Sequence, residues 1–246
     1  MTAVGRWCTA ICLLFLLPRV SIADETREEM VRARCLANLK KIMFACMRYA
    51  QDYGERFPDT LAHLYLHYVS GADTFRCPGD TATPPFATLT PDTRTSYLLV
   101  PGLTERDSPT FPLVYDASPD HHGGKGRCVA FVGGQGRFVS EEELQKLLAS
   151  LREEKRKEAA APGVALLSAV LTAQKVYYAK HDTFATSPAD LPVFPFAGSP
   201  FPSYRIVSAD SSGFVAETSG TGDLKGITVR LTYSASSGSR ITYSGL

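Results

Sequence analysis

One sequence pattern occurs twice in this chain, once in each half. In each copy, an apolar-striped helical stretch ends in a tyrosine-rich turn, which is followed by an aromatic residue and a short capped helix. The copies cover residues 49–61 and 177–191. Solenoid repeats recur every ~20–50 residues, and this separation is much longer. The pattern therefore predicts two copies of one small fold rather than a solenoid.

The length and composition are those of a globular protein. A chain of 246 residues allows one large domain or two small ones, and the repeat favours two. The hydrophobic fraction is 44% and the charged fraction 21%, both ordinary values. The net charge is +1, or −1 without residues 1–23, which hold two basic residues and no acidic one. This balance gives no electrostatic support for binding nucleic acid or an anionic membrane surface.

The N-terminal segment has the layout of an export signal. Arg6 precedes an apolar run over residues 7–17, Pro18 interrupts the run, and small residues end at Ala23. We predict a signal peptide over residues 1–23, cleaved after its last residue. A membrane anchor is less favoured, because a span needs about 20 apolar residues. The mature protein is expected to be periplasmic or extracellular, with no stable membrane span after cleavage.

Export affects the interpretation of the cysteines. Two of the six cysteines lie in the predicted signal peptide, so four remain after cleavage. An even number of cysteines in an oxidising compartment predicts two disulfides, and four cysteines allow three possible pairings. A zinc site is less favoured, because the chain has no CxxC pair and the spacings 11, 31 and 51 match no zinc module. Buried free thiols are the third alternative. The four remaining residues are Cys35, Cys46, Cys77 and Cys128.

Apolar periodicity predicts a long helix and then strands in the first half. Residues 26–53 carry an apolar stripe at steps of three, four or seven, and Gly54 ends the helix. Asp59 or Thr60 is expected to cap a short helix that runs through Leu66. Short β-prone runs between Pro and Gly turns then predict an antiparallel meander. These runs cover residues 96–100, 111–116, 128–132 and 136–139.

The second half repeats this order after a charged boundary. A capping box at residues 140–143 opens a helix, which runs into a charged and then Ala/Pro-rich linker at residues 152–162. A second helix carries residues 164–178, and Ser187 and Pro188 begin a short helix. Strands are expected at residues 203–208, 213–218, 227–233 and 240–243. The sequence thus predicts an α+β fold with tandem domains at 24–151 and 163–246, each a long N-terminal helix packed on an antiparallel sheet.

Several motifs resemble one known family. In order along the chain, residues 35–42, 49–58 and 75–80 resemble the globular part of type II secretion pseudopilins and their type IV pilin-like relatives. The resemblance is closest to the bacterial branch with a C-terminal H-X9-DG prepilin-associated segment, which residues 115–142 resemble. It covers roughly residues 27–148. The second half resembles a pilin globular domain more loosely, through residues 173–191.

The chain departs from this family in two respects. A prepilin has a Gly cleavage site, a Glu at the fifth mature position and about twenty apolar residues that form the filament core. Here Gly5 is followed by Arg6, no Glu stands at that place, and an export signal replaces the filament helix. In addition, Gly133 stands where the family's Asp is expected, and Cys128 stands where a polar residue is usual.

The resemblance implies an exported, non-enzymatic protein that works by contact with envelope or secretion-system proteins. It would be an accessory of type II secretion or type IV pilus-like systems, or an adaptor that reuses their fold. The resemblance also implies the disulfide pairs 35–77 and 46–128. Cys35 and Cys77 fit the family's pattern, whereas Cys46 and Cys128 are both atypical for it.

One polar cluster offers an alternative function. Asp120, His121 and His122 are adjacent, and with Asp116 they could ligate zinc or manganese in a secreted metal-dependent hydrolase. The favoured interpretation is a solvated loop, because adjacent histidines usually point apart and the following Gly-Gly indicates a turn. No GxSxG nucleophile motif is present. We therefore expect no metal, no cofactor and no enzymatic activity.

Overall fold

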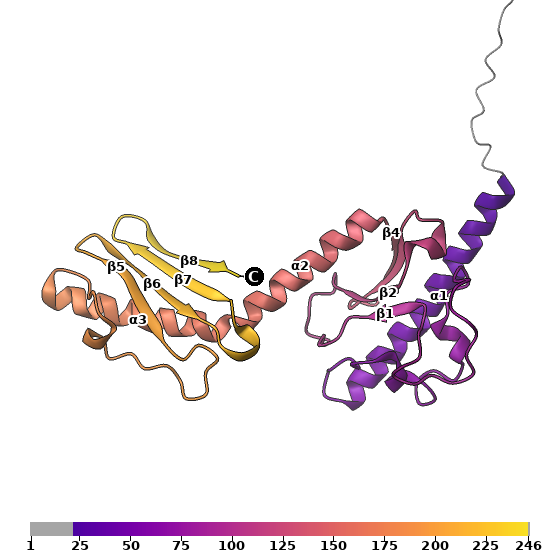
Figure 1. The fold of residues 1–246 in the computed structure, drawn as a ribbon, viewed down its shortest axis with the longest axis horizontal. Helices are drawn as coiled ribbons and strands as arrows, with labels where there is room; N and C mark the ends of the chain where they lie inside the picture. The colour runs from indigo at the N-terminus through magenta and orange to yellow at the C-terminus, as the bar shows by residue number, and fades with distance from the viewer. Residues whose placement is uncertain (1–21, 246) are drawn as a thin grey trace, which may run out of the picture. The chain divides into compact units, whose positions relative to one another are not determined.

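The computed structural model describes residues 22–245, so the predicted signal peptide lies outside the described residues except for its last two. The chain divides into two compact units, Met1–Leu144 and Gln145–Leu246. Each unit contains a long helix and a four-stranded antiparallel sheet (Figure 1). The predicted α+β class is therefore confirmed.

In the first unit, one face of a long helix packs on a meander. Helix α1 (Ile22–Asp52) carries Cys35, Leu39, Ile42 and Cys46 at steps of four, three and four, and all four are fully buried. This face contacts β2, β3 and β4. The antiparallel strands follow one another in the order β1 (Tyr97–Leu99), β2 (Pro112–Asp116), β3 (Arg127–Phe131) and β4 (Gly136–Val139). The predicted meander is confirmed.

The segment between α1 and the sheet has little regular structure. It contains two short 3₁₀ turns, η1 (Leu61–Leu64) and η2 (Ala72–Phe75). Thr60 precedes η1, but its side chain makes no capping hydrogen bond, so the predicted cap is wrong. The element is a single 3₁₀ turn rather than a full helix, and its apolar residues Leu61 and Leu64 are buried. Packing of these two side chains therefore holds the turn in place.

The second unit begins within a helix. In α2 (Glu141–Ala159), Ser140 Oγ accepts the N–H of Glu143 at 3.1 Å, which confirms that cap. Helix α3 (Ala161–His181) follows after a 49° bend at Ala160, which is fully buried in the core of the second unit. Residues 152–162 are thus helical on both sides of the bend, and the division between the units falls earlier, after Leu144.

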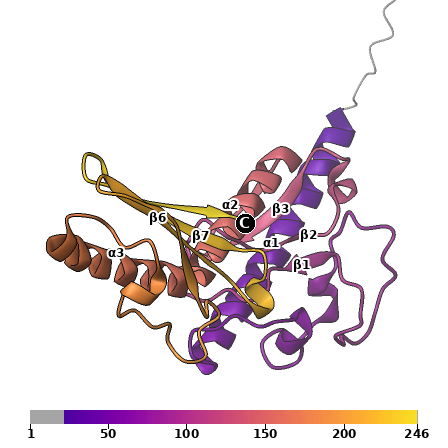
Figure 2. The same cartoon turned by 60° about the vertical axis from the view of Figure 1, so that its left-hand side comes forward.

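The second sheet repeats the order of the first. Figure 2 shows α3 running along the sheet, and its contacts are with β6 and β7. Gln174, fully buried on α3, donates to the carbonyl of Ala185 and accepts its N–H, both at 2.8 Å. Ser187 caps η4 (Pro188–Asp190) as predicted. The strands follow in sequence as β5 (Tyr204–Ala209), β6 (Gly213–Ser219), β7 (Thr228–Ser234) and β8 (Gly238–Ser244).

The repeated sequence pattern makes equivalent contacts in the two units. After each long helix, a phenylalanine is buried to 4% exposure: Phe57 in the first unit and Phe184 in the second. The N–H of Phe57 donates to the carbonyl of Leu103 at 3.1 Å, and that of Phe184 to the carbonyl of Asp210 at 3.2 Å. Both acceptors lie between the first and second strands of their own sheet. The repeated sequence pattern thus anchors the end of the long helix to the equivalent loop in each unit.

Among the described residues, none of the helices by itself has both the length and the apolar composition of a membrane span. Helices α2 and α3 reach the required length and composition only when they are counted together across their bend.

Candidate metal centre

Four side chains with metal-ligating atoms meet in the interior of the first unit. One ligand atom from each lies within 4.8 Å of all the others, and no member is more than 1% exposed. We call this group the buried cluster; it consists of Cys35, Cys77, Asp116 and His122.

Each member comes from a different local structure. Cys35 belongs to the inward stripe of α1, and Cys77 follows η2. Asp116 is the last residue of β2. His122 ends the 3₁₀ turn η3 (Pro119–His122) between β2 and β3. The cluster therefore joins segments that are far apart in the sequence.

The η3 turn is encoded by its own residues. The side chain of Ser118 accepts the N–H of Asp120 at 3.1 Å, and Pro119 stands at the first position of the turn. Gly123 ends the turn in the left-handed region, with φ 65°, which glycine adopts at little cost. This geometry directs both histidines towards Asp116.

The carboxylate of Asp116 is the centre of the contacts. Its Oδ2 lies 3.2 Å from Cys35 Sγ and 2.8 Å from His122 Nε2. His122 Nε2 in turn lies 3.8 Å from Cys77 Sγ and 3.5 Å from Cys128 Sγ. The other ring nitrogen of His122, Nδ1, has no hydrogen-bond partner among the described residues. The ring therefore presents Nε2 to the cluster.

A second layer of polar groups surrounds the cluster. The backbone N–H of Cys128 donates to Asp116 Oδ2 at 3.0 Å. His121 lies between two carboxylates, with Nδ1 3.4 Å from Asp116 Oδ1 and Nε2 3.4 Å from Asp80 Oδ2. Asp80 is nearly fully buried and accepts the hydroxyl of Ser96 at 2.6 Å. These contacts fix the orientation of the cluster's carboxylate and histidine.

The charges in this region are strongly coupled. Burial alone would raise the pKa of Asp116, but hydrogen bonds from His121 and His122 outweigh it and lower the pKa to about 2. Burial would lower the pKa of each histidine, but the hydrogen bond to Asp116 raises both values to about 9. The Cys128 thiol raises the pKa of Cys35, and the Cys35 thiol raises that of Cys77. Without a cation, the carboxylate is therefore ionised and these two thiols are protonated.

The structure brings together only some of the residues of the predicted polar cluster. Asp116, His121 and His122 meet, but Asp120 does not, because its carboxylate accepts the hydroxyl of Ser118 at an exposed position. The interpretation of the two histidines as a solvated pair is wrong. His122 is 1% exposed, and the side chain of His121 is 10% exposed.

The structure contradicts the predicted 46–128 disulfide, whereas the 35–77 pair stays a prediction. In the structure, all four cysteines of the described chain are free thiols. The thiol of Cys128 lies 3.9 Å from the carbonyl oxygen of Arg32, which is 14 residues from Cys46 on α1. At 1.5 Å per residue this is about 21 Å along the helix, far beyond disulfide reach. Cys35 and Cys77 are close, but their thiols face Asp116 and His122.

Sequence reasoning missed Cys35 and Cys77 as partners of the histidine loop. The only local signal was the motif at residues 77–80, in which Pro78 and Gly79 separate Cys77 from Asp80. A Cβ atom at Gly79 would lie 1.9 Å from the carbonyl oxygen of His121. Glycine is therefore required for this segment to approach η3 closely.

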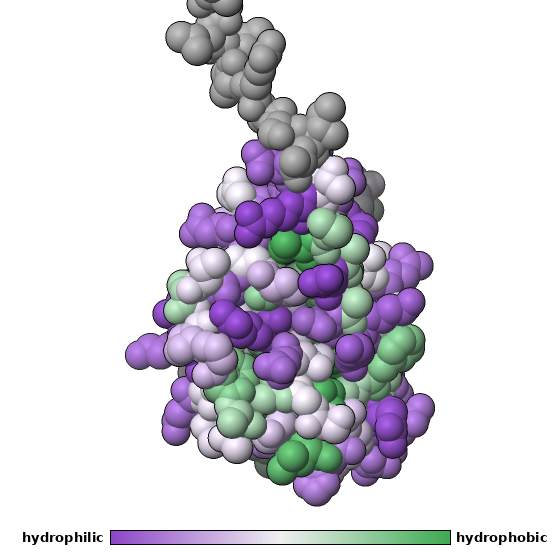
Figure 3. Space-filling model, turned by 90° about the vertical axis from the view of Figure 1, so that its right-hand side faces the viewer, coloured by the Kyte–Doolittle hydropathy of each residue, from purple (hydrophilic) through white to green (hydrophobic). Residues whose placement is uncertain are grey.

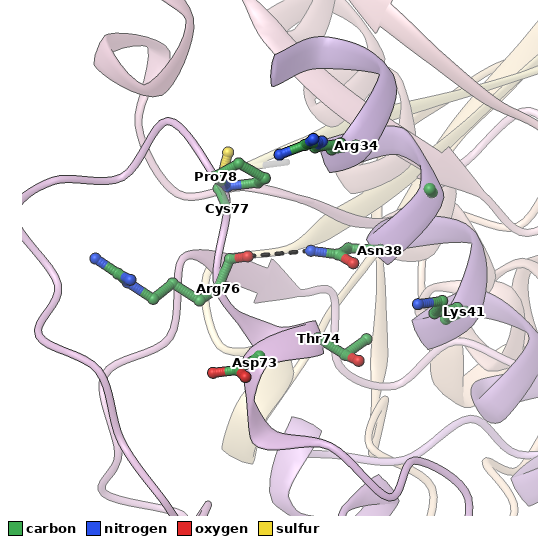
Figure 4. A pocket seen from close by; sticks show the side chains of 9 residues that line it. Arg34, Asn38, Lys41, Asp73, Thr74, Arg76, Cys77 and Pro78 are labelled. Atoms are coloured by element: carbon green, nitrogen blue, oxygen red, sulfur yellow. Dashed lines mark hydrogen bonds between the residues drawn. The ribbon is translucent and has the colours of Figure 1, made fainter. Parts of the chain in front are cut away.

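An open pocket of about 450 Å³ lies beside the cluster, between α1 and the segment that contains Cys77. Asn38 Nδ2 donates to the carbonyl of Arg76 across this pocket at 3.1 Å (Figure 4). The guanidinium of Arg76 donates hydrogen bonds to the carbonyls of Thr83 and Asp80, so these donors are not available to a ligand in the pocket. Cys77 is the only member of the buried cluster that lines the pocket.

Comparisons with known proteins give no further assignment. The chain matches no protein-family model, and no curated protein or solved structure matches it.

Proposed function

We propose that the protein is an exported, non-enzymatic component with two tandem pilin-like domains that works by contact with envelope or secretion-system proteins. The observation that carries the proposal is the equivalence of the two units. In each, a long helix packs on a four-stranded antiparallel meander. The backbone N–H of the phenylalanine after the helix donates a hydrogen bond to the loop between the first two strands. This is the arrangement that the resemblance to pilin-like domains implies.

The alternative, a metal-dependent hydrolase, is less well supported. A catalytic metal keeps an open coordination position for water or substrate, whereas a structural metal is enclosed by protein ligands. Asp116 and His122 are at most 1% exposed, and Asp120 lies away from them. The residues proposed for hydrolysis therefore do not form one accessible site, which favours a protein that acts through its surface.

The second unit offers a surface for such contacts. Phe194 and Phe196 lie two residues apart between η4 and β5, and are 84% and 75% exposed. The first unit also exposes large apolar side chains, but they are scattered singly along its sequence, and the one face drawn in Figure 3 is mainly hydrophilic; these residues are Met30, Phe44, Tyr53, Leu66 and Leu98. Neighbouring large apolar side chains in water are typical of interaction sites. We infer that the loop with these two phenylalanines contacts a partner protein.

Site-specific photo-crosslinking in the native cell tests the proposal. A photoreactive amino acid at Phe194 is expected to form a defined crosslink to an envelope protein, and Phe196→Ser is expected to weaken it. The matched control position is Phe44, an exposed phenylalanine on α1 in the first unit. Retention of the protein in the cytoplasm, or an equal crosslinking pattern at both positions, would contradict the proposal. So would a hydrolase activity of the purified protein that His122→Ala abolishes.

A further inference from the structure

We propose that the buried cluster is a structural zinc site, in which Cys35 Sγ, Cys77 Sγ, one Asp116 carboxylate oxygen and His122 Nε2 bind one zinc ion. The proposal goes beyond the function proposed above and does not depend on it. The sequence alone, by contrast, predicts no bound metal.

The donor set fits zinc better than other common cations. Calcium and magnesium prefer all-oxygen sites, whereas thiolate and imidazole ligands suit zinc. Four ligands without space for a solvent molecule are typical of structural zinc sites. The buried cluster supplies two sulfurs, one nitrogen and one oxygen, all at 1% exposure or less.

The distances agree with tetrahedral coordination. A zinc ion with Zn–S bonds of about 2.3 Å and Zn–N and Zn–O bonds of about 2.0–2.1 Å holds its ligand atoms about 3.3–3.8 Å apart. In the structure, Asp116 Oδ2 lies 3.2 Å from Cys35 Sγ and 2.8 Å from His122 Nε2, and Cys77 Sγ lies 3.8 Å from His122 Nε2. These three separations lie within about 0.6 Å of the tetrahedral values, and the other three are at most 4.8 Å, so shifts of about 1 Å or less in the separations would complete the site.

The surrounding groups support these ligands. Metal-bound carboxylates and histidines are normally oriented by further hydrogen bonds. Asp116 accepts the N–H of Cys128, and its other oxygen faces His121, which is held in turn by Asp80. This second layer leaves His122 Nε2 directed at the cluster.

Two residues beside the cluster compete as ligands: His121, whose ring nitrogens already face Asp116 and Asp80, and Cys128. The Cys128 thiol lies 3.5 Å from His122 Nε2, so a set of three cysteines and one histidine has to be distinguished from the proposed set. The backbone of Cys128 already serves Asp116 as a hydrogen-bond donor, and its thiol also points to the carbonyl of Arg32. We therefore assign Cys128 to the surrounding layer.

The site explains how the irregular segment of the first unit is held. Residues 53–96 contain only the two 3₁₀ turns as helical structure. A zinc ion bound by Cys77 would fix this segment to α1, β2 and η3 at once. Since a site of this kind does not exist in the unfolded chain, the free energy of zinc binding becomes folding free energy.

Metal analysis of the purified full-length protein tests the proposal. We expect about one zinc per chain after anaerobic incubation with zinc and a reductant, followed by removal of free metal. Cobalt, used as a spectroscopic substitute, should show a thiolate-to-metal charge-transfer band and intense tetrahedral ligand-field bands. A protein that stays zinc-free, or cobalt without a thiolate band, would overturn the proposal. Neither measurement requires a variant to fold.

Variants then test the ligand assignment. Cys77→Ser and His122→Gln are expected to lower zinc affinity by at least about 100-fold. The matched control is Cys46→Ser, which makes the same change at a fully buried cysteine of α1 outside the cluster and should keep the zinc. Undiminished binding by Cys77→Ser, or loss of zinc from Cys46→Ser, would overturn the proposal.

Two further results would also overturn it. The first is loss of zinc from Cys128→Ser together with its retention by Asp116→Asn, since Cys128 would then replace Asp116 as a ligand. The second is a disulfide between Cys35 and Cys77 in the exported protein, found by non-reducing peptide mapping. Failure of the zinc site would leave the proposed contact function intact, because that proposal depends on the second unit's surface.

Discussion

At the scale of single residues, the motif at residues 77–80 determines how the irregular segment meets the sheet. Gly79 passes so close to η3 that a Cβ atom would overlap the carbonyl oxygen of His121. Asp80 then accepts the backbone N–H groups of Ala82 and Thr83, both at 2.9 Å, and the hydroxyl of Ser96. One glycine and one carboxylate thus hold the segment beside the buried cluster.

Gly79→Ala should therefore destabilise the first unit. We expect a loss of about 1–3 kcal/mol in the free energy of unfolding, because the backbone of η3 must move. Gly71→Ala is the matched control: its nearest contact is the Thr74 hydroxyl at 3.9 Å, and it should change stability by less than about 0.5 kcal/mol. Urea denaturation measures both. Equal losses would show that the close approach at Gly79 is unimportant.

Asp80→Asn tests the buried carboxylate through its pH dependence. Burial would raise the pKa of Asp80, but hydrogen bonds from Ser96 and Thr83 outweigh it and hold the pKa well below its usual range. The charge therefore stabilises the folded protein above the unfolded pKa of about 4, and this stabilisation is lost as the pH falls further.

At neutral pH, we expect Asp80→Asn to lower the free energy of unfolding by about 1.5–3 kcal/mol. The difference from the wild type should narrow as the pH falls below about 4. Chemical denaturation between neutral and acidic pH measures it, with Asp92→Asn, at an exposed position, as the control. A difference that stays constant over this range would contradict the account of Asp80.

At the scale of elements, local pattern predicted the strands well and the site poorly. β4 has the predicted bounds, and the other strands of the first sheet differ from theirs by at most one residue at either end, since Pro and Gly turns limit them. The buried cluster was not predictable in this way. Its members are separated by irregular segments, and only tertiary packing brings Cys77 to Asp116. The prediction of a cap at Thr60 was wrong, because the packing of buried side chains rather than a capping hydrogen bond holds that turn.

The two buried phenylalanines of the repeated pattern should have equivalent roles. We expect Phe57→Ala to lower the stability of the first unit, and Phe184→Ala that of the second, each by about 3–5 kcal/mol. Hydrogen exchange of the two sheets measures each unit separately. Phe44→Ala, at an exposed position, is the control and should leave both sheets protected. A large effect of either core substitution on the other unit alone would contradict the assignment.

At the scale of the whole molecule, two units with the same arrangement of elements follow a predicted export signal. The repeat in the sequence corresponds to a repeat in the structure, since both units place a long helix before a four-stranded meander. The units differ in how they are stabilised. Both have an extensive apolar core, that of the second including Phe201, Val229 and Leu231, but the buried cluster belongs to the first unit.

The export prediction is tested by the N-terminus of the mature protein. Cleavage after Ala23 should give a chain that begins at Asp24, because the small residues before it fit a signal peptidase site. Intact-mass measurement of the protein from the native envelope identifies the terminus. A chain that begins at Met1, or directly after Gly5 as in a prepilin, would contradict the prediction.

Zinc-edge X-ray absorption of the reconstituted full-length protein is the most direct test of the proposed site. We predict a four-coordinate ion with two sulfurs at about 2.3 Å and two nitrogen or oxygen atoms at about 2.0–2.1 Å, one of them from an imidazole. A shell of three sulfurs, or one of oxygen and nitrogen atoms alone, would contradict the assignment of Cys35, Cys77, Asp116 and His122.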